Sequence, residues 1–242
     1  MNKYLTILHL YPHEMNLYGD HGNILVLKRR LEWRGYEAKV VQYGPGDNQS
    51  IIDRADIIFG GGGQDSGQAG IEDDLRAIST RIKSKIKSGT PTLVVCGMYQ
   101  LFGNFFRTIE GDAIDGISVF DLETVGGKDR LTGNVVAASG RFGEIIGYEN
   151  HSGRTYLGAD TEPLATIIKG VGNNDKDRYE GAMHKNAIGT YLHGPVLSKN
   201  PKMADFLLAT AWELKYKEKL NLTKLDIDKT VEQARRIAKS RP

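Results

Sequence analysis

The sequence predicts an α/β fold: a mostly parallel sheet flanked by helices, with additional antiparallel strands in the second half. Short apolar segments alternate with longer segments of helical period over the first hundred residues, which is typical of a doubly wound sheet. From about residue 117 the pattern changes to short β-type segments between glycines and polar turns, which indicates antiparallel strands.

Composition excludes several classes of protein. The 242 residues are 40% hydrophobic, which is enough for a sizeable core, and 32 basic against 30 acidic residues leave a formal charge of +2. This balance implies no strong attraction to nucleic acid or to an anionic membrane. There is no apolar run of about 18 residues and no signal-peptide pattern, so we expect no membrane insertion. A single cysteine fits a reducing compartment, and we expect a cytoplasmic protein.

Four apolar segments of the first half are predicted strands, at residues 4–10, 38–41, 56–59 and 92–95. Asp20 is a candidate N-cap for a helix that carries Ile24, Leu27 and Leu31 on one face. The clearest helix has apolar residues at spacings of 4, 3, 4 and 4 and ends at Gly89; these residues are Ile71, Leu75, Ile78, Ile82 and Ile86.

The second half is predicted to contain short strands at residues 117–120, 131–138, 144–148 and 164–168. Residues 170–177 are expected to form an exposed and mobile polar loop. A strand at 187–192 leads into His193-Gly-Pro195, and a helix follows whose expected inward residues are Met203, Phe206, Leu207, Thr210, Ala211 and Leu214. We expect residues 1–218 to form one domain and residues 219–242 to form a charged C-terminal helix or tail.

Cys96 lies at the centre of the predicted chemistry. It follows the apolar strand at 92–95 and precedes Gly97 and a segment of helical character. A side chain at such a strand–turn–helix bend is held out of the sheet beside the positive end of a helix, as in a nucleophile elbow. That environment favours the reactive thiolate. The alternative is a buried core cysteine, because free cysteine is among the most buried residue types.

A thiolate nucleophile also needs a base and an oxyanion hole. His193 is the best-placed histidine, because it ends a predicted strand, and His151 is second. Backbone N–H groups of Gly97 or Met98 could form the oxyanion hole with one from the four glycines at 60–63. Phosphate-binding motifs of the types GxxxxGK[ST] and GxGxxG are missing, so ATP binding is not expected, and the histidine spacing predicts no metal site.

Together these residues resemble the class I glutamine amidotransferases, which have a flavodoxin-like fold, and in particular their cobyric-acid-synthase-like branch. Within that branch the sequence is similar to the GatD-type glutaminase subunit of lipid II isoglutaminyl synthase. The resemblance covers about residues 4–215. Its motifs are Asn16-Leu17-Tyr18 with Gly22-Asn23-Ile24, Gly61-Gly62-Gly63, Val95-Cys96-Gly97 with Tyr99-Gln100, Arg130-Leu-Thr-Gly133, Gly147 to His151 with Gly153 to Tyr156, Gly170 to Asp175, and Gly189 to Pro195.

The resemblance implies the following roles. Cys96 would attack the side-chain amide of L-glutamine to give a thioester, with His193 acting as base and then as acid. Gln100, Gly97 and the loop that contains Gly61 and Gly62 would shape the glutamine and oxyanion pocket. Arg130 would hold the substrate, through a pairing of its guanidinium with the α-carboxylate.

The resemblance also implies a partner. Ammonia would pass to a Mur-ligase-like subunit in a heterodimer. That subunit would use ATP and Mg²⁺ to amidate the D-glutamate α-carboxyl of lipid II, in peptidoglycan synthesis. This chain would need no cofactor of its own. The alternatives are an amidotransferase of another pathway, such as cobyric-acid-type amidation, a cysteine hydrolase on the same fold, and a non-catalytic binding module.

One position departs from the family pattern. Fuller class I enzymes carry an acid two residues after the histidine, where it orients the imidazole. Here that residue is Pro195. Either a Cys–His dyad suffices, or another carboxylate, from this chain or from the partner chain, orients His193. The second hypothesis predicts weak glutaminase activity for this chain alone and higher activity after the ligase subunit is added.

Overall fold

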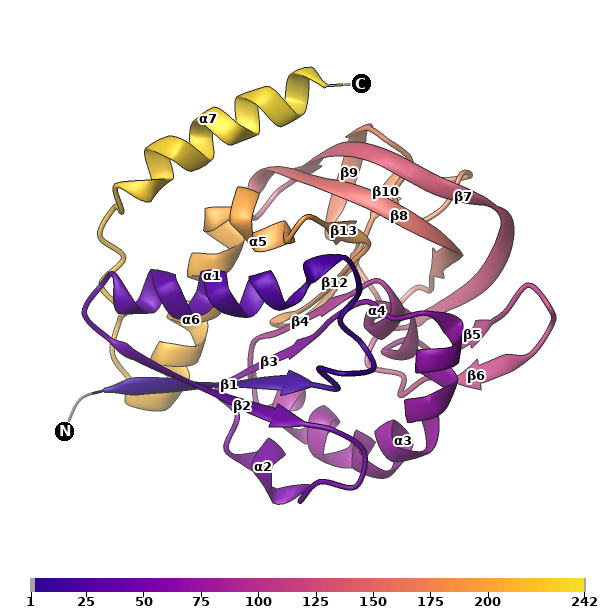
Figure 1. Cartoon of the computed structure of the whole chain (residues 1–242), viewed down its shortest axis with the longest axis horizontal. Helices are drawn as coiled ribbons and strands as arrows, with labels where there is room; N and C mark the ends of the chain where they lie inside the picture. The colour runs from indigo at the N-terminus through magenta and orange to yellow at the C-terminus, as the bar shows by residue number, and fades with distance from the viewer. Residues whose placement is uncertain (1–2, 242) are drawn as a thin grey trace.

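The computed structural model describes residues 3–241. The chain forms two β-sheets (Figure 1). The first has six strands in the order β11-β12-β4-β3-β1-β2, all parallel to their neighbours except β11. Its strands are β1 (Tyr4–Leu10), β2 (Glu37–Tyr43), β3 (Ile57–Gly60), β4 (Thr92–Val95), β11 (Ala182–His184) and β12 (Ala187–Thr190). The predicted parallel sheet is therefore confirmed.

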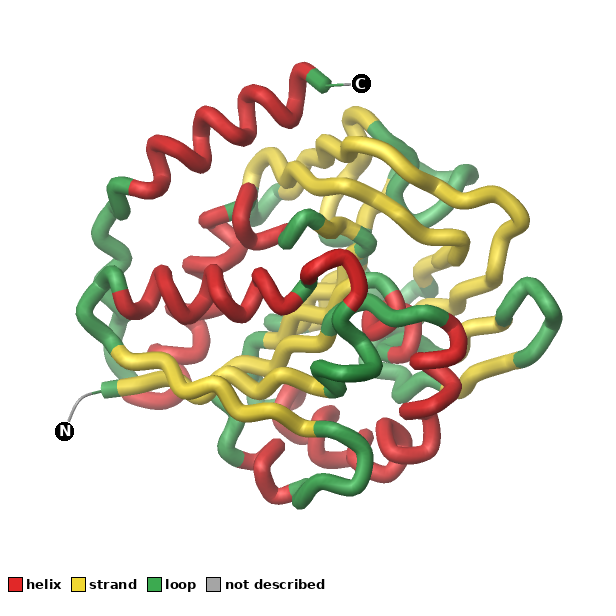
Figure 2. Tube along the Cα trace, viewed as in Figure 1, coloured by secondary structure: helices red, strands yellow, loops and turns green. Residues whose placement is uncertain are grey.

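Helices cover both faces of this sheet (Figure 2). Helices α1 (His21–Glu32) and α6 (Pro201–Tyr216) pack together on one face, and α2 (Ser50–Asp53) and α3 (Asp65–Lys87) pack together on the other. The periodic isoleucine and leucine residues of α3 are all buried, as predicted. Gly89, just after α3, has φ of +95°, a left-handed conformation that glycine adopts without steric cost.

The second sheet has seven strands, in the order β10-β9-β7-β5-β6, with β8 paired to β7 and β13 paired to β8. Its strands are β5 (Phe105–Arg107), β6 (Ala113–Asp115), β7 (Leu122–Ser139), β8 (Gly143–Leu157), β9 (Ala165–Lys169), β10 (Tyr179–Glu180) and β13 (Leu192–His193). Strands β7 and β8 are 18 and 15 residues long, far longer than predicted. Many side chains of this hairpin are exposed, so its strands contain glycines and polar residues. These residues interrupt the apolar pattern from which strands are predicted.

The prediction of a strand at residues 117–120 is wrong. Ile117 and Phe120 are buried, but the backbone N–H groups of this segment donate to carbonyl oxygens of residues 101–103 at the end of α4 (Gly97–Leu101). The segment thus caps a helix instead of joining a sheet. Burial alone produced its apolar pattern.

The loop at residues 170–177 is not exposed throughout, which corrects a second prediction. Asn173 and Asn174 are fully buried. The N–H groups of Val171 and Gly172 donate to the two carboxylate oxygens of Glu149, at 2.9 and 2.7 Å. The polar side chains that suggested exposure instead satisfy buried backbone groups.

The C-terminal part contains the short helix α5 (Val196–Lys199), α6 and α7 (Ile227–Ser240). In α6, Met203, Leu207 and Ala211 are buried as expected, but Leu214 is 37% exposed. Helix α7 has no buried residue and lies at the edge of the molecule, beyond α5 (Figure 1). Polar contacts hold it, among them Arg30 with Asp228 at 2.7 Å. The division into residues 1–218 and 219–242 stays a prediction.

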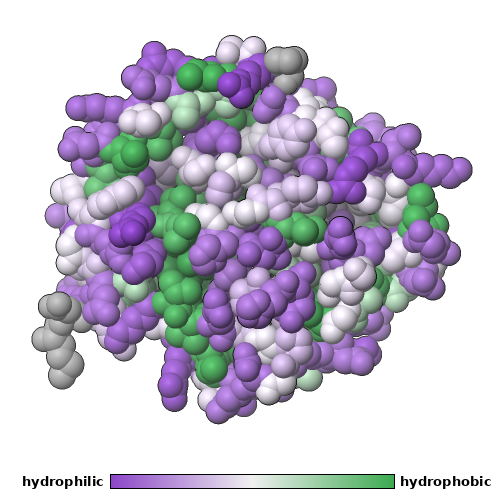
Figure 3. Space-filling model, viewed as in Figure 1, coloured by the Kyte–Doolittle hydropathy of each residue, from purple (hydrophilic) through white to green (hydrophobic). Residues whose placement is uncertain are grey.

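Polar side chains cover most of the face seen in Figure 3, with small apolar areas between them. Within residues 3–241, every helix is too short or too polar to cross a membrane.

Candidate active site

The glycine loop at Gly61–Gly63 and the bend at Cys96 lie at the carboxyl ends of neighbouring parallel strands. The glycine loop follows β3, and Cys96 follows β4. Cys96 has φ of +53° and ψ of −109°, a conformation that costs energy in a residue with a Cβ and that is typical of functional sites. Its N–H donates to Thr190 O at 2.8 Å, and its carbonyl accepts from Gln100 N at 3.0 Å in the first turn of α4. The strand–turn–helix bend therefore holds the thiol at the sheet edge.

His193 and Asp20 lie side by side at this edge. Nδ1 of His193 is 3.1 Å from Oδ1 of Asp20, and both side chains are almost completely buried. The second oxygen of Asp20 accepts from Gly62 N at 2.8 Å. Asp20 occupies the N-cap position of α1, as predicted, but its side chain makes no capping hydrogen bond. The carboxylate that the sequence left unidentified belongs to this chain.

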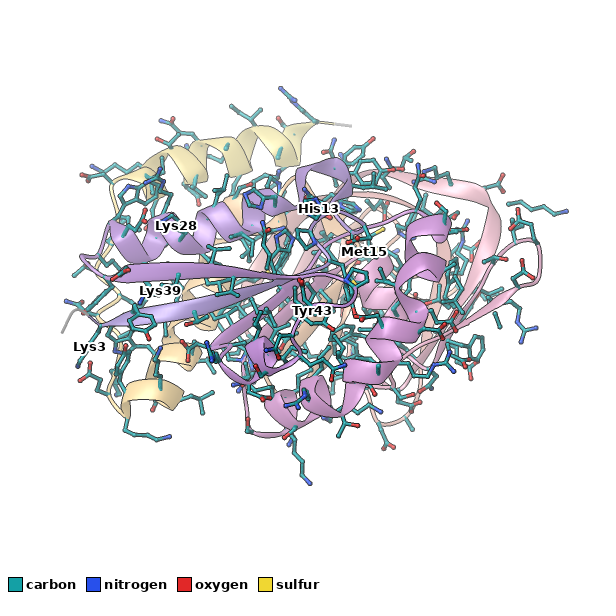
Figure 4. The ribbon with its side chains drawn as sticks, turned by 60° about the horizontal axis from the view of Figure 1, so that its bottom comes forward. Lys3, His13, Met15, Lys28, Lys39 and Tyr43 are labelled. Atoms are coloured by element: carbon teal, nitrogen blue, oxygen red, sulfur yellow. The ribbon has the colours of Figure 1, made fainter. Side chains whose placement is uncertain are left out.

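Gly62 shows how closely the three side chains approach one another. A Cβ on Gly62 would lie 3.1 Å from Cε1 of His193, 3.2 Å from Oδ2 of Asp20 and 3.2 Å from Cβ of Cys96. Only glycine leaves this space open. Met15, labelled in Figure 4, fills the space beside the next glycine, where a Cβ on Gly63 would lie 2.2 Å from its sulfur.

The electrostatics of His193 follow from these neighbours. Burial alone would lower its pKa, but the hydrogen bond to Asp20 and the interaction with the Cys96 sulfur raise the pKa from 6.5 to about 10. Nε2 of His193 has no partner within strict hydrogen-bond limits among residues 3–241. Nucleophile–base contacts are often loose before substrate binds. The site therefore favours a protonated imidazole beside the Cys96 sulfur.

His193 reaches the site because the chain passes from the first sheet to the second just before it. Strand β12 belongs to the first sheet, and β13, after a break at Tyr191, pairs with β8 in the second. Glu180 supports this break, because its Oε1 accepts from Thr190 Oγ1 at 2.5 Å and from Tyr191 N at 3.2 Å. Burial raises the pKa of Glu180 to about 7. The predicted single strand at 187–192 is thus two strands with a buried carboxyl group at the joint.

One of the expected oxyanion donors already makes a hydrogen bond within the protein. Met98 N donates to Gly61 O at 3.4 Å, so it is not free. The N–H groups of Gly63 and Gly97 have no acceptor among residues 3–241. They are close together, because a Cβ on Gly97 would lie 2.9 Å from Gly63 N. These two groups are the donors that remain for an oxyanion beside Cys96.

A cavity of about 430 Å³ opens over Cys96. It is lined by Leu17, Tyr18, Gly63, Gln64, Asp65, Ser66, Cys96, Gln100, Arg130, Asn150, His151 and Ser152. A larger cavity of about 680 Å³ lies under α7 and contains none of the predicted site residues. The smaller cavity, which contains Cys96, Gln100 and Arg130, is therefore the candidate active site.

The structure brings Arg130 and Gln100 to this cavity. Arg130 lies in the irregular part of β7, between Gly126 and Leu131, where pairing with β8 is interrupted. Its Nε donates to Asn150 Oδ1 at 2.6 Å, and its Nη2 donates to Tyr18 OH at 2.8 Å. Gln100 is buried, accepts from Gln68 Nε2 at 2.7 Å and donates to Tyr191 OH at 3.1 Å.

His151 lies in the same cavity but in a different environment from His193. Its ring stacks on Tyr191 with centroids 3.6 Å apart, and its Nδ1 pairs with Gly153 O at 2.8 Å. Burial lowers its pKa to about 3, so it stays neutral. This ring is poorly suited to cycling a proton near pH 7. Elsewhere in residues 3–241, no three His, Cys, Asp or Glu side chains converge as metal ligands would.

Comparison with known proteins identifies the family. The model of the CobB/CobQ-like glutamine amidotransferase domain matches residues 6–201. The chain belongs to this family. The predicted amidotransferase enzyme is thereby confirmed, and so is its cobyric-acid-synthase-like branch.

Two curated relatives are similar over most of their length. The GatD subunit of lipid II isoglutaminyl synthase (glutamine-hydrolyzing) from Staphylococcus aureus is 42% identical over 211 residues, which cover 87% of this chain and 86% of that protein. The corresponding subunit from Streptococcus pneumoniae is 39% identical, over 90% of this chain and 84% of that protein. A probable cobyric acid synthase from Methanosphaera stadtmanae is 32% identical, but over only 24% of its own length.

Solved structures share the amidotransferase fold. A glutamine amidotransferase crystal structure superposes with a TM-score of 0.59 at 16% identity, over 84% of this chain and 98% of that one. The structure of PurLQS from Thermotoga maritima also gives a TM-score of 0.59, at 15% identity, over 86% and 98% of the two chains. At these identities the likeness concerns the fold alone.

Proposed function

We propose that this amidotransferase is the glutaminase subunit of a lipid II isoglutaminyl synthase. The observation that carries the proposal is the group of Cys96, His193 and Asp20 at the edge of a cavity that also contains Arg130. The similarity to two GatD subunits over most of their length supports the choice of pathway.

In the proposed first half-reaction, the Cys96 sulfur attacks the side-chain carbonyl carbon of L-glutamine. The carbonyl oxygen becomes an oxyanion and accepts hydrogen bonds from the N–H groups of Gly63 and Gly97. His193 donates its proton to the amide nitrogen, and the C–N bond breaks. Ammonia departs, and a γ-glutamyl thioester remains on Cys96.

In the second half-reaction, His193 removes a proton from a water molecule that attacks the thioester. The C–S bond breaks, glutamate leaves, and the sulfur and imidazole return to their starting state. Asp20 orients the imidazole and stabilises its charge throughout, as the acid of a catalytic triad does. Because Asp20 belongs to this chain, orientation of His193 requires no carboxylate from a partner.

Arg130 would bind the α-carboxylate of glutamine, since its planar guanidinium suits a carboxylate. Gln100 would close the inner side of the cavity. Its side-chain amide is fixed by Gln68 and Tyr191, so it offers a rigid wall to the substrate. Gly61 and Gly62 would keep the backbone of the glycine loop close to the reacting atoms.

The ammonia would pass to a Mur-ligase-like partner in a heterodimer. That partner would use ATP and Mg²⁺ to activate the D-glutamate α-carboxyl of lipid II and would convert it to D-isoglutamine. We place the reaction in the cytoplasm, where ATP is present.

The test is ammonia release from L-glutamine by the chain with and without its ligase subunit, beside Cys96→Ala. We expect release that the substitution abolishes. If the chain releases no ammonia in either setting and Cys96 does not react with a glutamine-derived diazoketone, the proposal is wrong. Amidation of lipid II by the pair then tests the pathway, since a glutaminase that supports no amidation would belong elsewhere.

A further inference from the structure

The cavity over Cys96 contains one charged side chain of each sign. Arg130 is its cation, and Asp65 is the one carboxylate among its lining residues. We propose that Asp65 receives the α-ammonium group of the substrate while Arg130 binds the α-carboxylate, so that the cavity selects an α-amino acid amide. This inference rests on the proposed function and adds a specificity-determining residue to it.

Asp65 is well placed for this role. It is the first residue of α3 and directly follows the glycine loop and Gln64. Burial and the charge of Glu110 raise its pKa, whereas Arg130 lowers it, so Asp65 and Arg130 lie within electrostatic reach of each other. Among residues 3–241, no side chain forms an ion pair with Asp65. Asp65 therefore lines the cavity as a carboxylate without an ion-pair partner among these residues.

Three other acceptors of the cavity are less suitable. Asn150 Oδ1 already accepts from Arg130, and the Tyr18 hydroxyl also accepts from Arg130. His151 Nε2 has no partner, but it is closed off from solvent and therefore from an entering ligand. Asp65 is exposed at the cavity wall, and a carboxylate complements an ammonium group.

The alternative role for Asp65 is structural. A carboxylate in the first turn of a helix interacts favourably with the helix dipole. That role would affect the stability of α3 and would not distinguish one substrate from another. Substrate discrimination is therefore the decisive measurement.

We would compare L-glutamine with glutaramate, which has the same chain and amide but a hydrogen in place of the α-ammonium. The variant is Asp65→Asn, which keeps the shape and removes the charge. The matched control is Asp73→Asn, a fully exposed acid on the same helix. We expect Asp65→Asn to lower kcat/KM for L-glutamine about tenfold, through KM, because a hydrogen bond to a charged group is lost. The value for glutaramate should stay within about twofold, as should both values in the control.

Equal losses for both substrates, or no loss for L-glutamine, would overturn the inference and leave the glutaminase proposal intact. A second measurement does not require turnover: calorimetric binding of L-glutamine and glutaramate to Cys96→Ala and to Cys96→Ala with Asp65→Asn. The dissociation constant of L-glutamine should rise about tenfold in the double variant. If that rise occurs and the wild-type chain hydrolyses no glutamine, the inference holds and the proposed function fails.

Discussion

At the residue scale, the site depends on side chains that are far apart in the sequence. Asp20 and His193 are 173 positions apart, yet their polar atoms are 3.1 Å apart. Cys96 and His193 were recognisable because each follows a β-branched or apolar strand segment. Asp20 was not, since an acid just before a helix is also the pattern of a side-chain N-cap. The contact between Asp20 and His193 can be seen only in the tertiary structure.

Asp20→Asn should leave the fold intact but impair turnover. The amide would no longer stabilise the charged imidazole of His193. We expect kcat for glutamine hydrolysis to fall roughly 10²- to 10⁴-fold, by analogy with the loss of the acid from other triads. KM should change little, because Asp20 does not line the substrate cavity. Steady-state kinetics would measure both constants, and a kcat within about threefold of wild type would show that Cys96 and His193 act as a dyad.

At the element scale, the glycine loop after β3 and the break between β12 and β13 decide the geometry. The loop was predicted from its four consecutive glycines, and the structure gives the reason for Gly62: its missing Cβ leaves room for the three catalytic candidates. The break was not predicted. Residues 187–192 were predicted as one continuous strand, because nothing in their local pattern marks the change from one sheet to the other.

Gly62→Ala should inactivate the enzyme with a modest effect on folding. The added Cβ would lie 3.1 Å from the His193 ring, so the ring or the loop must move. A displacement of this kind can reduce the rate by about 100-fold. The matched control is Gly70→Ala in α3, where an added Cβ meets no atom within 4 Å. That variant should retain activity and gain about 0.5–1 kcal/mol in the free energy of unfolding.

Glutaminase assays and urea unfolding of both alanine variants would test this contrast. Full activity in Gly62→Ala would mean that the loop tolerates the extra methyl group and that its closeness to His193 is unimportant.

At the scale of the whole molecule, the active site forms where the two sheets meet. The six-stranded sheet contributes Cys96, and the second sheet contributes His193 through β13. The long β7–β8 hairpin carries Arg130 and Asn150 to the same cavity. Helix α7 lies outside this arrangement and makes polar contacts with it, such as those of Arg235 with Lys199 O and Glu144 O.

Stability of the whole chain should depend on pH through His193. Its pKa is about 10 in the folded protein and 6.5 in its ordinary state, so protonation favours the fold. This contribution is complete below pH 6.5 and is lost as pH rises through about 10. The Tm of wild type relative to His193→Gln should therefore be highest near about pH 6 and should decline toward about pH 10. A difference that grows with pH would contradict the raised pKa.

The sequence by itself determined the parallel α/β core and indicated Cys96 and His193 as candidate nucleophile and base, because these depend on local periodicity and on turns that follow single strands. It also indicated Arg130, through the family resemblance. Only the tertiary structure decided which acid contacts His193, which N–H groups remain free beside Cys96, and that Asp65 and Arg130 line one cavity. These are relations between segments that meet only after the two sheets have formed, and no local pattern records a distance between distant residues.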